Sequence, residues 1–213
     1  MKRCIIFDMD GTLANTAKIT VPACIKAARE YGLTPPGESA VMATIGIGGL
    51  DFYRKLFPTV DEATLPALAR RIFELEKEKS RELGLDLLFA GVGKMLNTLA
   101  QAGMTLAIAS TGETGHVDNV LTVTGIKHLF AEIKCNTNDK AGQLKELMET
   151  FQGYDDYRMV GDKPKDSEAA RINGIYSIGV GYGFSTLDEL YGFDRIAIKP
   201  SEICSILGVK YDD

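Results

Sequence analysis

Tryptophan is absent from the 213-residue sequence, which contains only two histidines and four cysteines. The cysteines are scattered and form no Cys-x-x-Cys pair, so neither a disulfide framework nor a zinc site is expected. They are Cys4, Cys24, Cys135 and Cys204. Their use fits the reducing cytoplasm. No apolar run approaches the roughly 18–20 residues of a membrane-spanning helix, so no membrane partner is expected.

An excess of positive charge is also lacking. The chain has 24 Lys and Arg residues against 29 Asp and Glu residues, a net charge of −5, so no basic surface for nucleic acid is expected. Hydrophobic residues make up 45% and charged residues 25%, which excludes a disordered or fibrous protein. The length allows one domain, or one domain with an insert. Whether the protein is a monomer or a homodimer stays open.

Short apolar runs recur along the chain, and helix-spaced apolar residues separate most of them. The first run, 4–7, does not alternate with polar residues, as in a strand buried on both faces. Later runs span 105–110, 131–135, 158–160, 176–180 and 195–198. Helical spacing occupies 92–99 and 144–151, and each pattern is followed by a glycine. This alternation predicts an α/β fold with a Rossmann-like, doubly wound, mostly parallel sheet.

One interval interrupts the alternation. Between 15 and 86 helical patterns occur without a convincing strand, and a glycine-rich loop lies at 45–49. We therefore expect residues 15–86 to form a helical cap domain, inserted into an α/β core domain of residues 1–14 and 87–213. The two short connections are expected to let the cap open and close.

Aspartates follow the expected first and fourth strands where those strands end. Asp8 and Asp10 are separated by one residue, which leaves both carboxylates on the same side of an extended chain. Asp162 ends the fourth strand, and Asp166 follows it by four residues. Because parallel strands place their carboxyl ends at one edge, these carboxylates should converge, and oxygen ligands alone suit Mg²⁺ rather than zinc. We expect Asp8, Asp10 and Asp162 to be the metal ligands.

Groups suited to a phosphate lie at the same edge. Ser110, Thr111 and Gly112 follow the second strand and offer hydroxyl and backbone N–H groups. Lys140 opens the helix after the third strand, where a cation opposes the helix dipole by ~0.3–1 kcal/mol. An unfavourable charge at a ligand-binding strand end indicates a functional residue, because a bound anion would reverse the sign of the interaction.

In their order along the chain, these residues resemble the four motifs of the haloacid dehalogenase superfamily. The motifs are Asp8-x-Asp10-Gly11-Thr12, Ser110, Lys140 and Gly161-Asp162-x-x-x-Asp166. The resemblance covers nearly the whole chain, and the helical insert lies where the superfamily's first cap type belongs. Segments 89–92 and 173–183 are most similar to the phosphoglycolate phosphatase branch.

The resemblance implies a Mg²⁺-dependent phosphatase that acts on a small, phosphoglycolate-like phosphate ester. It implies that Asp8 is the nucleophile that forms an aspartyl-phosphate, that Asp10 is the general acid and base, and that Lys140 offsets negative charge. Asp162 would complete the magnesium site. Asp166 is expected either to support the metal ligands or merely to lie in a first helical turn. The expected substrate-binding residues are Gly11, Thr12, Ser110, Thr111 and Gly112.

Two lysine motifs depart from the family pattern. The lysine of the third motif often precedes a proline in close relatives, but none follows here, and we choose Lys140 over Lys134 because Lys134 would lie inside a strand. Lys163-Pro164 is also less usual between the two aspartates of the fourth motif, so the roles of Lys163 and Lys165 stay open.

Two other functions stay open. A sugar-phosphate mutase similar to β-phosphoglucomutase would pass the phosphoryl group to a second hydroxyl, whereas a catalytically silent phosphate-binding module would show no turnover. A dehalogenase is disfavoured, because cleavage of a carbon–halogen bond needs no leaving-group acid such as Asp10.

Substrate specificity is expected to come from the cap, around 46–54, where Arg54 or Lys55 is a candidate to meet a substrate carboxylate. His116 is expected to be an exposed surface residue rather than a catalyst. Three aromatic residues of the cap are expected to be core residues: Phe52, Tyr53 and Phe57.

Overall fold

A computed structural model describes residues 1–211 and contains one six-stranded sheet. All strand pairs are parallel, in the order β3-β2-β1-β4-β5-β6. The strands are β1 (Arg3–Phe7), β2 (Thr105–Ala109), β3 (Phe130–Lys134), β4 (Asp156–Gly161), β5 (Tyr176–Val180) and β6 (Arg195–Ala197). This confirms the predicted α/β fold with a doubly wound parallel sheet, and the strands lie at nearly the expected positions.

The register of the sheet sets the position of the site. Phe7, the last residue of β1, pairs with Ile108 of β2 and with Val160 of β4. The loops that follow β1, β2 and β4 therefore leave the sheet at the same level. The order of the strands reverses at β1, and such a switch point at the carboxyl ends is where open α/β sheets bind ligands.

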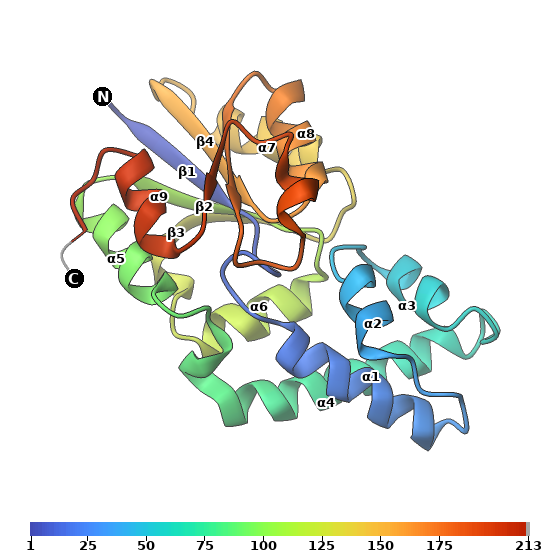
Figure 1. The fold of residues 1–213 in the computed structure, drawn as a ribbon. Coiled ribbons are helices and arrows are strands. Elements are labelled where there is room, and N and C mark those ends of the chain that lie inside the picture. Colours follow the sequence, from blue (N-terminus) through green and yellow to red (C-terminus); the bar gives the residue numbers. More distant parts are fainter. Residues whose placement is uncertain (212–213) are drawn as a thin grey trace.

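Helices cover both faces of the sheet (Figure 1). Ile5 and Phe7 face an apolar cluster shared with helices α5, α6 and α9, whereas Cys4 and Ile6 face a second cluster shared with α7 and α8. This division follows from the alternation of side chains along a strand. The helices are α5 (Val92–Gln101), α6 (Thr114–Val123), α7 (Lys140–Thr150), α8 (Pro164–Ile172) and α9 (Pro200–Ile206), with short 3₁₀ turns η1 (Gly84–Leu87), η2 (Lys127–Leu129) and η3 (Leu187–Leu190).

Four of the helices between β1 and β2 form a bundle beside the sheet (Figure 1). They are α1 (Ala17–Glu30), α2 (Glu38–Thr44), α3 (Leu50–Leu56) and α4 (Leu65–Leu83). Their buried apolar side chains, from Ala23 to Leu75, form a cluster separate from the two clusters of the sheet. The boundary of a cap domain at 15–86 stays a prediction, which this separate cluster supports.

The chain crosses between the bundle and the sheet twice, and the two crossings run side by side. The backbone N–H of Asn15 donates to the carbonyl of Leu87 at 2.8 Å, and that of Phe89 donates to the carbonyl of Leu13 at 3.1 Å. Ala14 and Leu88 form an antiparallel bridge. The bundle is therefore joined to the sheet through two adjacent segments, and their use as a hinge stays a prediction. Among residues 1–211, no helix combines the length and the apolar composition needed to cross a membrane.

Candidate active site

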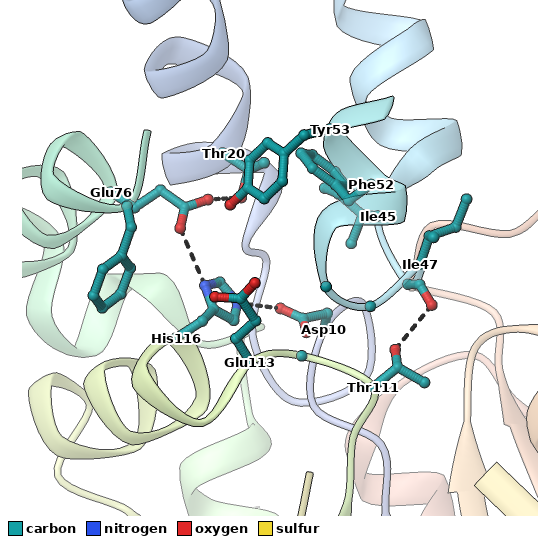
Figure 2. Close-up of a pocket in the computed structure, with 15 residues that line it drawn as sticks. Asp10, Thr20, Ile45, Ile47, Phe52, Tyr53, Glu76, Thr111, Glu113 and His116 are labelled. Carbon is teal, nitrogen blue, oxygen red and sulfur yellow. Dashed lines mark hydrogen bonds and ion pairs between the residues drawn. The ribbon is translucent and has the colours of Figure 1, made fainter. Parts of the chain in front are cut away.

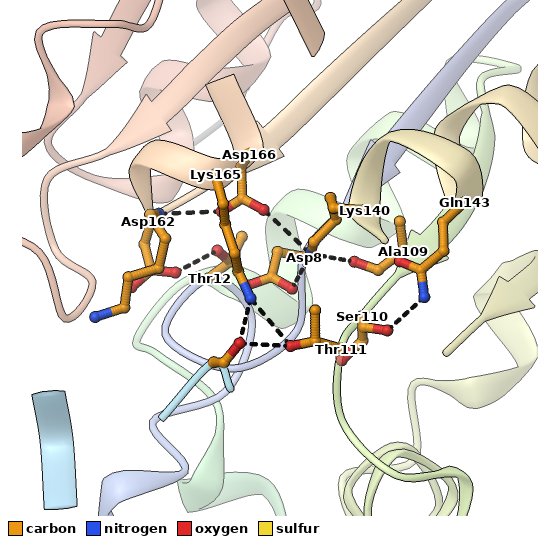
Figure 3. A network of polar contacts seen from close by, with 12 residues as sticks. Asp8, Thr12, Ala109, Ser110, Thr111, Lys140, Gln143, Asp162, Lys165 and Asp166 are labelled. Carbon is orange, nitrogen blue, oxygen red and sulfur yellow. Dashed lines mark hydrogen bonds and ion pairs between the residues drawn. The ribbon is translucent and has the colours of Figure 1, made fainter. Parts of the chain in front are cut away.

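Asp8 and Lys140 form a buried ion pair at the carboxyl end of β1 (Figure 3). Lys140 is the first residue of α7, and Asp139 caps that helix by accepting a hydrogen bond from Gly142 N–H at 2.8 Å. The Lys140 Nζ lies 2.6 Å from Asp8 Oδ1 and 3.1 Å from Asp166 Oδ1. It also donates to the carbonyl of Ala109 at 2.7 Å. The structure therefore brings Lys140 to the expected nucleophile.

Lys140 is charged despite its burial. Burial by itself lowers the pKa of this lysine, but the negative charges of Asp166 and Asp8 outweigh that effect and raise its pKa above the ordinary value. The lysine is thus a fixed positive charge in a water-poor site, where electrostatic interactions are stronger than in water. Lys134 lies at the end of β3 and pairs with Glu132 and Glu146 instead.

Two more carboxylates lie beside this pair and form a group of three with Asp8. Asp8, Asp162 and Asp166 each offer an oxygen, all within 4.8 Å of one another, and all three residues are buried. Phe184 N–H donates to Asp162 Oδ2 at 2.9 Å, and the Thr12 hydroxyl donates to Asp162 Oδ1 at 3.4 Å. Burial, followed by repulsion among the carboxylates, raises the pKa of Asp162 to about 8. Burial is also the main cause that raises the pKa of Asp8 to about 6, against the lowering effect of Lys140.

These oxygens could hold a hard divalent cation, because the donors are all oxygen and the carboxylates are close enough to share one ion. The side chain of Asp10, an expected ligand, lies outside this group, and Asp166 takes its place among the clustered carboxylates. Asp166 also accepts from Lys163 N–H at 3.0 Å, in the first turn of α8. A metal role for Asp10 therefore stays a prediction.

Gly11 allows the loop after β1 to approach the fourth-strand loop. Its φ is +82°, in the region that favours glycine, and a Cβ at this position would collide with the Asp162 carboxylate and with Phe184. The Gly11 N–H donates to the carbonyl of Ala14 at 2.9 Å, which closes the turn. The backbone of Gly11 thus lies directly at the carboxylate group, as its place in the first motif suggests.

Asp10 turns toward α6 and binds a histidine there (Figure 2). His116 Nε2 lies 2.9 Å from Asp10 Oδ1, and His116 Nδ1 lies 3.2 Å from Glu76 Oε2. Glu76 in turn accepts a hydrogen bond from the Thr20 hydroxyl at 2.6 Å. Burial raises the pKa of Asp10, but the charge and the hydrogen bond of His116 outweigh it and leave this pKa below the ordinary value.

The expectation that His116 is an exposed surface residue is wrong. Its side chain is only 16% exposed, and burial by itself would lower its pKa, but Asp10 and Glu76 hold that pKa well above its usual range. No sequence signal indicated these contacts, because Asp10 lies 106 positions and Glu76 lies 40 positions from the histidine.

The residues after β2 lie between the carboxyl end of the sheet and the helical insert. Ser110 is fully buried, its hydroxyl accepts from Gly112 N–H at 3.0 Å, and its carbonyl accepts from Gln143 Nε2 at 2.7 Å. Thr111 is also buried, and its hydroxyl donates to the carbonyl of Gly46 in the glycine-rich loop at 2.8 Å. The structure thus brings Ser110 and Gly112 to the site, whereas the Thr111 hydroxyl contacts the helical insert.

Lys165 lies in the same place, although its role was open from the sequence. Its Nζ donates to the Thr111 hydroxyl at 3.0 Å and to the carbonyl of Gly46 (Figure 3). Burial and then the nearby charge of Lys140 lower the pKa of Lys165. Lys163 points elsewhere, over the ring of Phe184.

A cavity of about 70 Å³ lies between the helical insert and the sheet (Figure 2). Asp10, His116 and Glu76 line one part of it. The rest includes glycine backbone of the 46–49 loop, Glu113 and the side chains of Ile45, Ile47, Phe52, Tyr53 and Phe73. A space of this kind can enclose a small leaving group next to Asp10.

The aromatic residues of the bundle lie partly as expected, and its two candidate cations lie on its surface. Phe52 and Phe57 are buried in the bundle, as expected, but Phe52 and Tyr53 also border the cavity. Arg54 is 45% exposed and pairs with acidic neighbours on the bundle surface, and Lys55 is exposed. Neither of these cations lines the cavity, so a contact of one of them with a substrate carboxylate stays a prediction that this arrangement does not favour.

Comparisons with known proteins agree with this arrangement. The model of the haloacid dehalogenase-like hydrolase family matches residues 5–180. The phosphoglycolate phosphatase of Vibrio cholerae is 30% identical over 192 residues, which cover 85% of each chain. The phosphoglycolate phosphatase of Pasteurella multocida is 30% identical over 193 residues, which cover 84% of this chain and 85% of that protein.

Solved structures show the same fold. The crystal structure of a predicted phosphoglycolate phosphatase from Haemophilus somnus matches with a TM-score of 0.86 and 24% identity, over 97% of this chain and 98% of that chain. A β-phosphoglucomutase from Clostridium difficile matches with a TM-score of 0.78 and 17% identity, over 95% of this chain and 93% of that chain. At these identities the structures support the fold alone.

Proposed function

Because the chain belongs to the haloacid dehalogenase-like hydrolase family, we propose that it is a Mg²⁺-dependent phosphatase that hydrolyses a small phosphomonoester. The observation that carries this proposal is the buried Asp8–Lys140 pair, 2.6 Å apart, within a group of three buried carboxylates at the switch point of the sheet. A carboxylate nucleophile, a fixed cation and an oxygen-only cation site suit phosphoryl transfer.

Asp8 acts as the nucleophile. One of its carboxylate oxygens attacks phosphorus, the bond between phosphorus and the ester oxygen breaks, and an aspartyl-phosphate forms. Asp10 acts here in its protonated form, and its carboxyl donates that proton to the departing alkoxide. In the second step a water attacks the same phosphorus, Asp10 takes up the proton of that water, and the bond to Asp8 breaks to release inorganic phosphate.

Lys140 orients Asp8 and offsets the charge that builds up during the attack. Its three partners fix the ammonium group, so no reorganisation is needed as the reaction proceeds. Ser110, with Thr12 and the backbone of Gly11 and Gly112, is proposed to bind the phosphoryl oxygens. The Thr111 hydroxyl is engaged by Gly46 in this closed arrangement, so Thr111 contributes through its backbone.

Asp8 and Asp162 are proposed to hold Mg²⁺, with Asp10 as a further ligand and Asp166 as a close support. The donor set fits this ion, because oxygens of three buried carboxylates lie within 4.8 Å of one another and, within residues 1–211, Lys140 is the one cationic side chain that forms ion pairs with them. When bound, Mg²⁺ supplies positive charge to the phosphoryl oxygens.

The substrate is proposed to be a small ester of the phosphoglycolate type. The curated relatives named phosphoglycolate phosphatase support this choice, as does the small volume of the cavity beside Asp10. The mutase alternative is supported by likeness of fold alone. A silent phosphate-binding module would not need the proposed nucleophile, acid and cation in one place. We also propose a cytoplasmic location, because all four cysteines are free.

The test is release of inorganic phosphate from a panel of small phosphate esters, with Mg²⁺ and with a chelator. We expect activity that requires Mg²⁺ and is abolished in Asp8→Asn. Full activity in excess chelator would refute the Mg²⁺ requirement, and turnover by Asp8→Asn would refute the nucleophile.

A further inference from the structure

A chain of side chains joins the proposed acid and base to the helical insert (Figure 2). Asp10 lies in the loop after β1 and His116 lies on α6, so both belong to the part of the chain around the sheet. Glu76 lies on α4 and Thr20 lies on α1, so both belong to the insert. The contact between His116 and Glu76 therefore crosses the boundary between the two parts.

His116 bridges two carboxylates at hydrogen-bonding distance. One ring nitrogen lies 2.9 Å from Asp10 and the other lies 3.2 Å from Glu76. Thr20 fixes the second carboxylate oxygen of Glu76 at 2.6 Å. Asp10, Glu76 and Thr20 are each at least nine-tenths buried, so bulk water does not compete freely for these bonds. A bridge with both ends fixed leaves the imidazole one orientation.

Movement of the insert would remove Glu76 from His116, because Glu76 lies on α4 of the insert. It is linked to the sheet through the adjacent connections at 13–15 and 87–89, and its glycine-rich loop contacts the sheet side through Thr111, Lys165 and Asn138. Helix α4 also packs on α6, where Asn119 Nδ2 donates to the Ser80 hydroxyl at 2.9 Å. If the loop contacts and the contact between α4 and α6 separate together, Glu76 moves away with α4 and His116 loses the partner that orients its ring. The position of the insert would thus decide whether both partners of the His116 ring are in place.

We propose that His116 is a positioning residue that sets the Asp10 carboxylate for proton transfer only when the insert is closed and Glu76 is in place. The inference rests on the proposed phosphatase function. It explains why a histidine of the sheet domain borders the leaving-group cavity without touching the phosphate site: it acts on the reaction through Asp10. The leaving group is then protonated only when the closed insert encloses it.

The test compares first-turnover rates of His116→Ala on two esters, an alkyl phosphate and 4-nitrophenyl phosphate. The alkyl alkoxide needs a proton to leave, whereas nitrophenolate does not. We expect the first turnover to slow about 10- to 100-fold on the alkyl ester, the range for loss of one hydrogen bond to a charged group. On 4-nitrophenyl phosphate we expect less than about a threefold change in the first turnover, with KM changing little for either ester.

Two further variants separate positioning from folding. His116→Gln retains a side-chain N–H donor and should recover part of the rate lost on the alkyl ester. Glu76→Gln should slow the alkyl ester in the same selective way, whereas Glu74→Gln, the same change two positions away on α4, should not, because Glu74 pairs with Arg71 on the surface. Thermal unfolding of each variant shows that it is folded.

A double variant completes the test. If His116 acts through Asp10, His116→Ala should cause no further loss in an Asp10→Asn background, because residues that act as one unit are not additive. Equal slowing of both esters, or additive losses, would overturn the positioning role while leaving the phosphatase intact. Absence of phosphate release from every ester by the unmodified protein would instead refute the proposed function, and with it the positioning role of His116.

Discussion

Lys140→Met should remove both stability and activity, and the structure gives the size of the first effect. Lys140 is 3% exposed and lies against two buried carboxylates, at 2.6 Å and 3.1 Å. Removing one partner of a buried ion pair typically costs about 3–5 kcal/mol, because the remaining charge is left buried and unpaired. The methionine fills much of the space of the lysine stem, so the loss reports charge rather than volume.

The assay is urea unfolding in the presence of a chelator, so that no bound cation replaces the lysine charge. The matched control is Lys145→Met, on the same helix but exposed, which should change the free energy of unfolding by less than about 0.5 kcal/mol. Phosphatase activity of Lys140→Met should fall by about 10²- to 10³-fold. A variant as stable as the control would refute the view that Lys140 neutralises the buried carboxylates.

Three other predictions follow from the same site. The pKa values of Asp8 and Asp162 are raised to about 6 and about 8, so the folded, metal-free protein binds more protons than the unfolded chain. Its stability in chelator should therefore fall as the pH rises from 5 to 8, as measured by thermal unfolding; a rise would contradict these shifts. Asp10→Asn should give a burst of nitrophenol and then turnover that is about 10²- to 10⁴-fold slower, in stopped-flow assays; equal loss on activated and alkyl esters would point to metal positioning instead. Gly48→Ala, whose Cβ would strike the Thr111 carbonyl, should raise KM for a natural ester more than for a small generic one, and equal effects would make the loop merely structural.

Much of the fold could be predicted from the sequence because its signals are local. The strand at Arg3–Phe7 is a short apolar run that ends in aspartates, and its burial on both faces follows from its composition. A functional role for Lys140 can also be predicted from its local sequence, because a lysine in a first helical turn opposes the helix dipole. Its contact with Asp8 then follows from the parallel order of the strands.

The parts of the site that the sequence did not indicate depend on contacts between the insert and the sheet. His116 was expected to be exposed, because nothing in its own neighbourhood shows that Asp10 and Glu76 would lie on its two sides. The position of Arg54 beside the glycine-rich loop makes it a candidate for substrate binding, but acidic neighbours on the bundle surface form ion pairs with it. Such pairings are set by how two packed units meet, and periodicity along the chain carries no information on that geometry.

The measurement that tests the central claim most directly is mass spectrometry of the enzyme after a reaction with substrate is quenched in acid. We expect an added phosphoryl group on the peptide that contains Asp8, and none in Asp8→Asn. The account predicts this label because Asp8, alone among the residues that the structure describes, combines the carboxyl end of β1, the Lys140 contact at 2.6 Å and a place among the clustered carboxylates. A label on any other residue, or a fully active enzyme that carries no label during turnover, would contradict it.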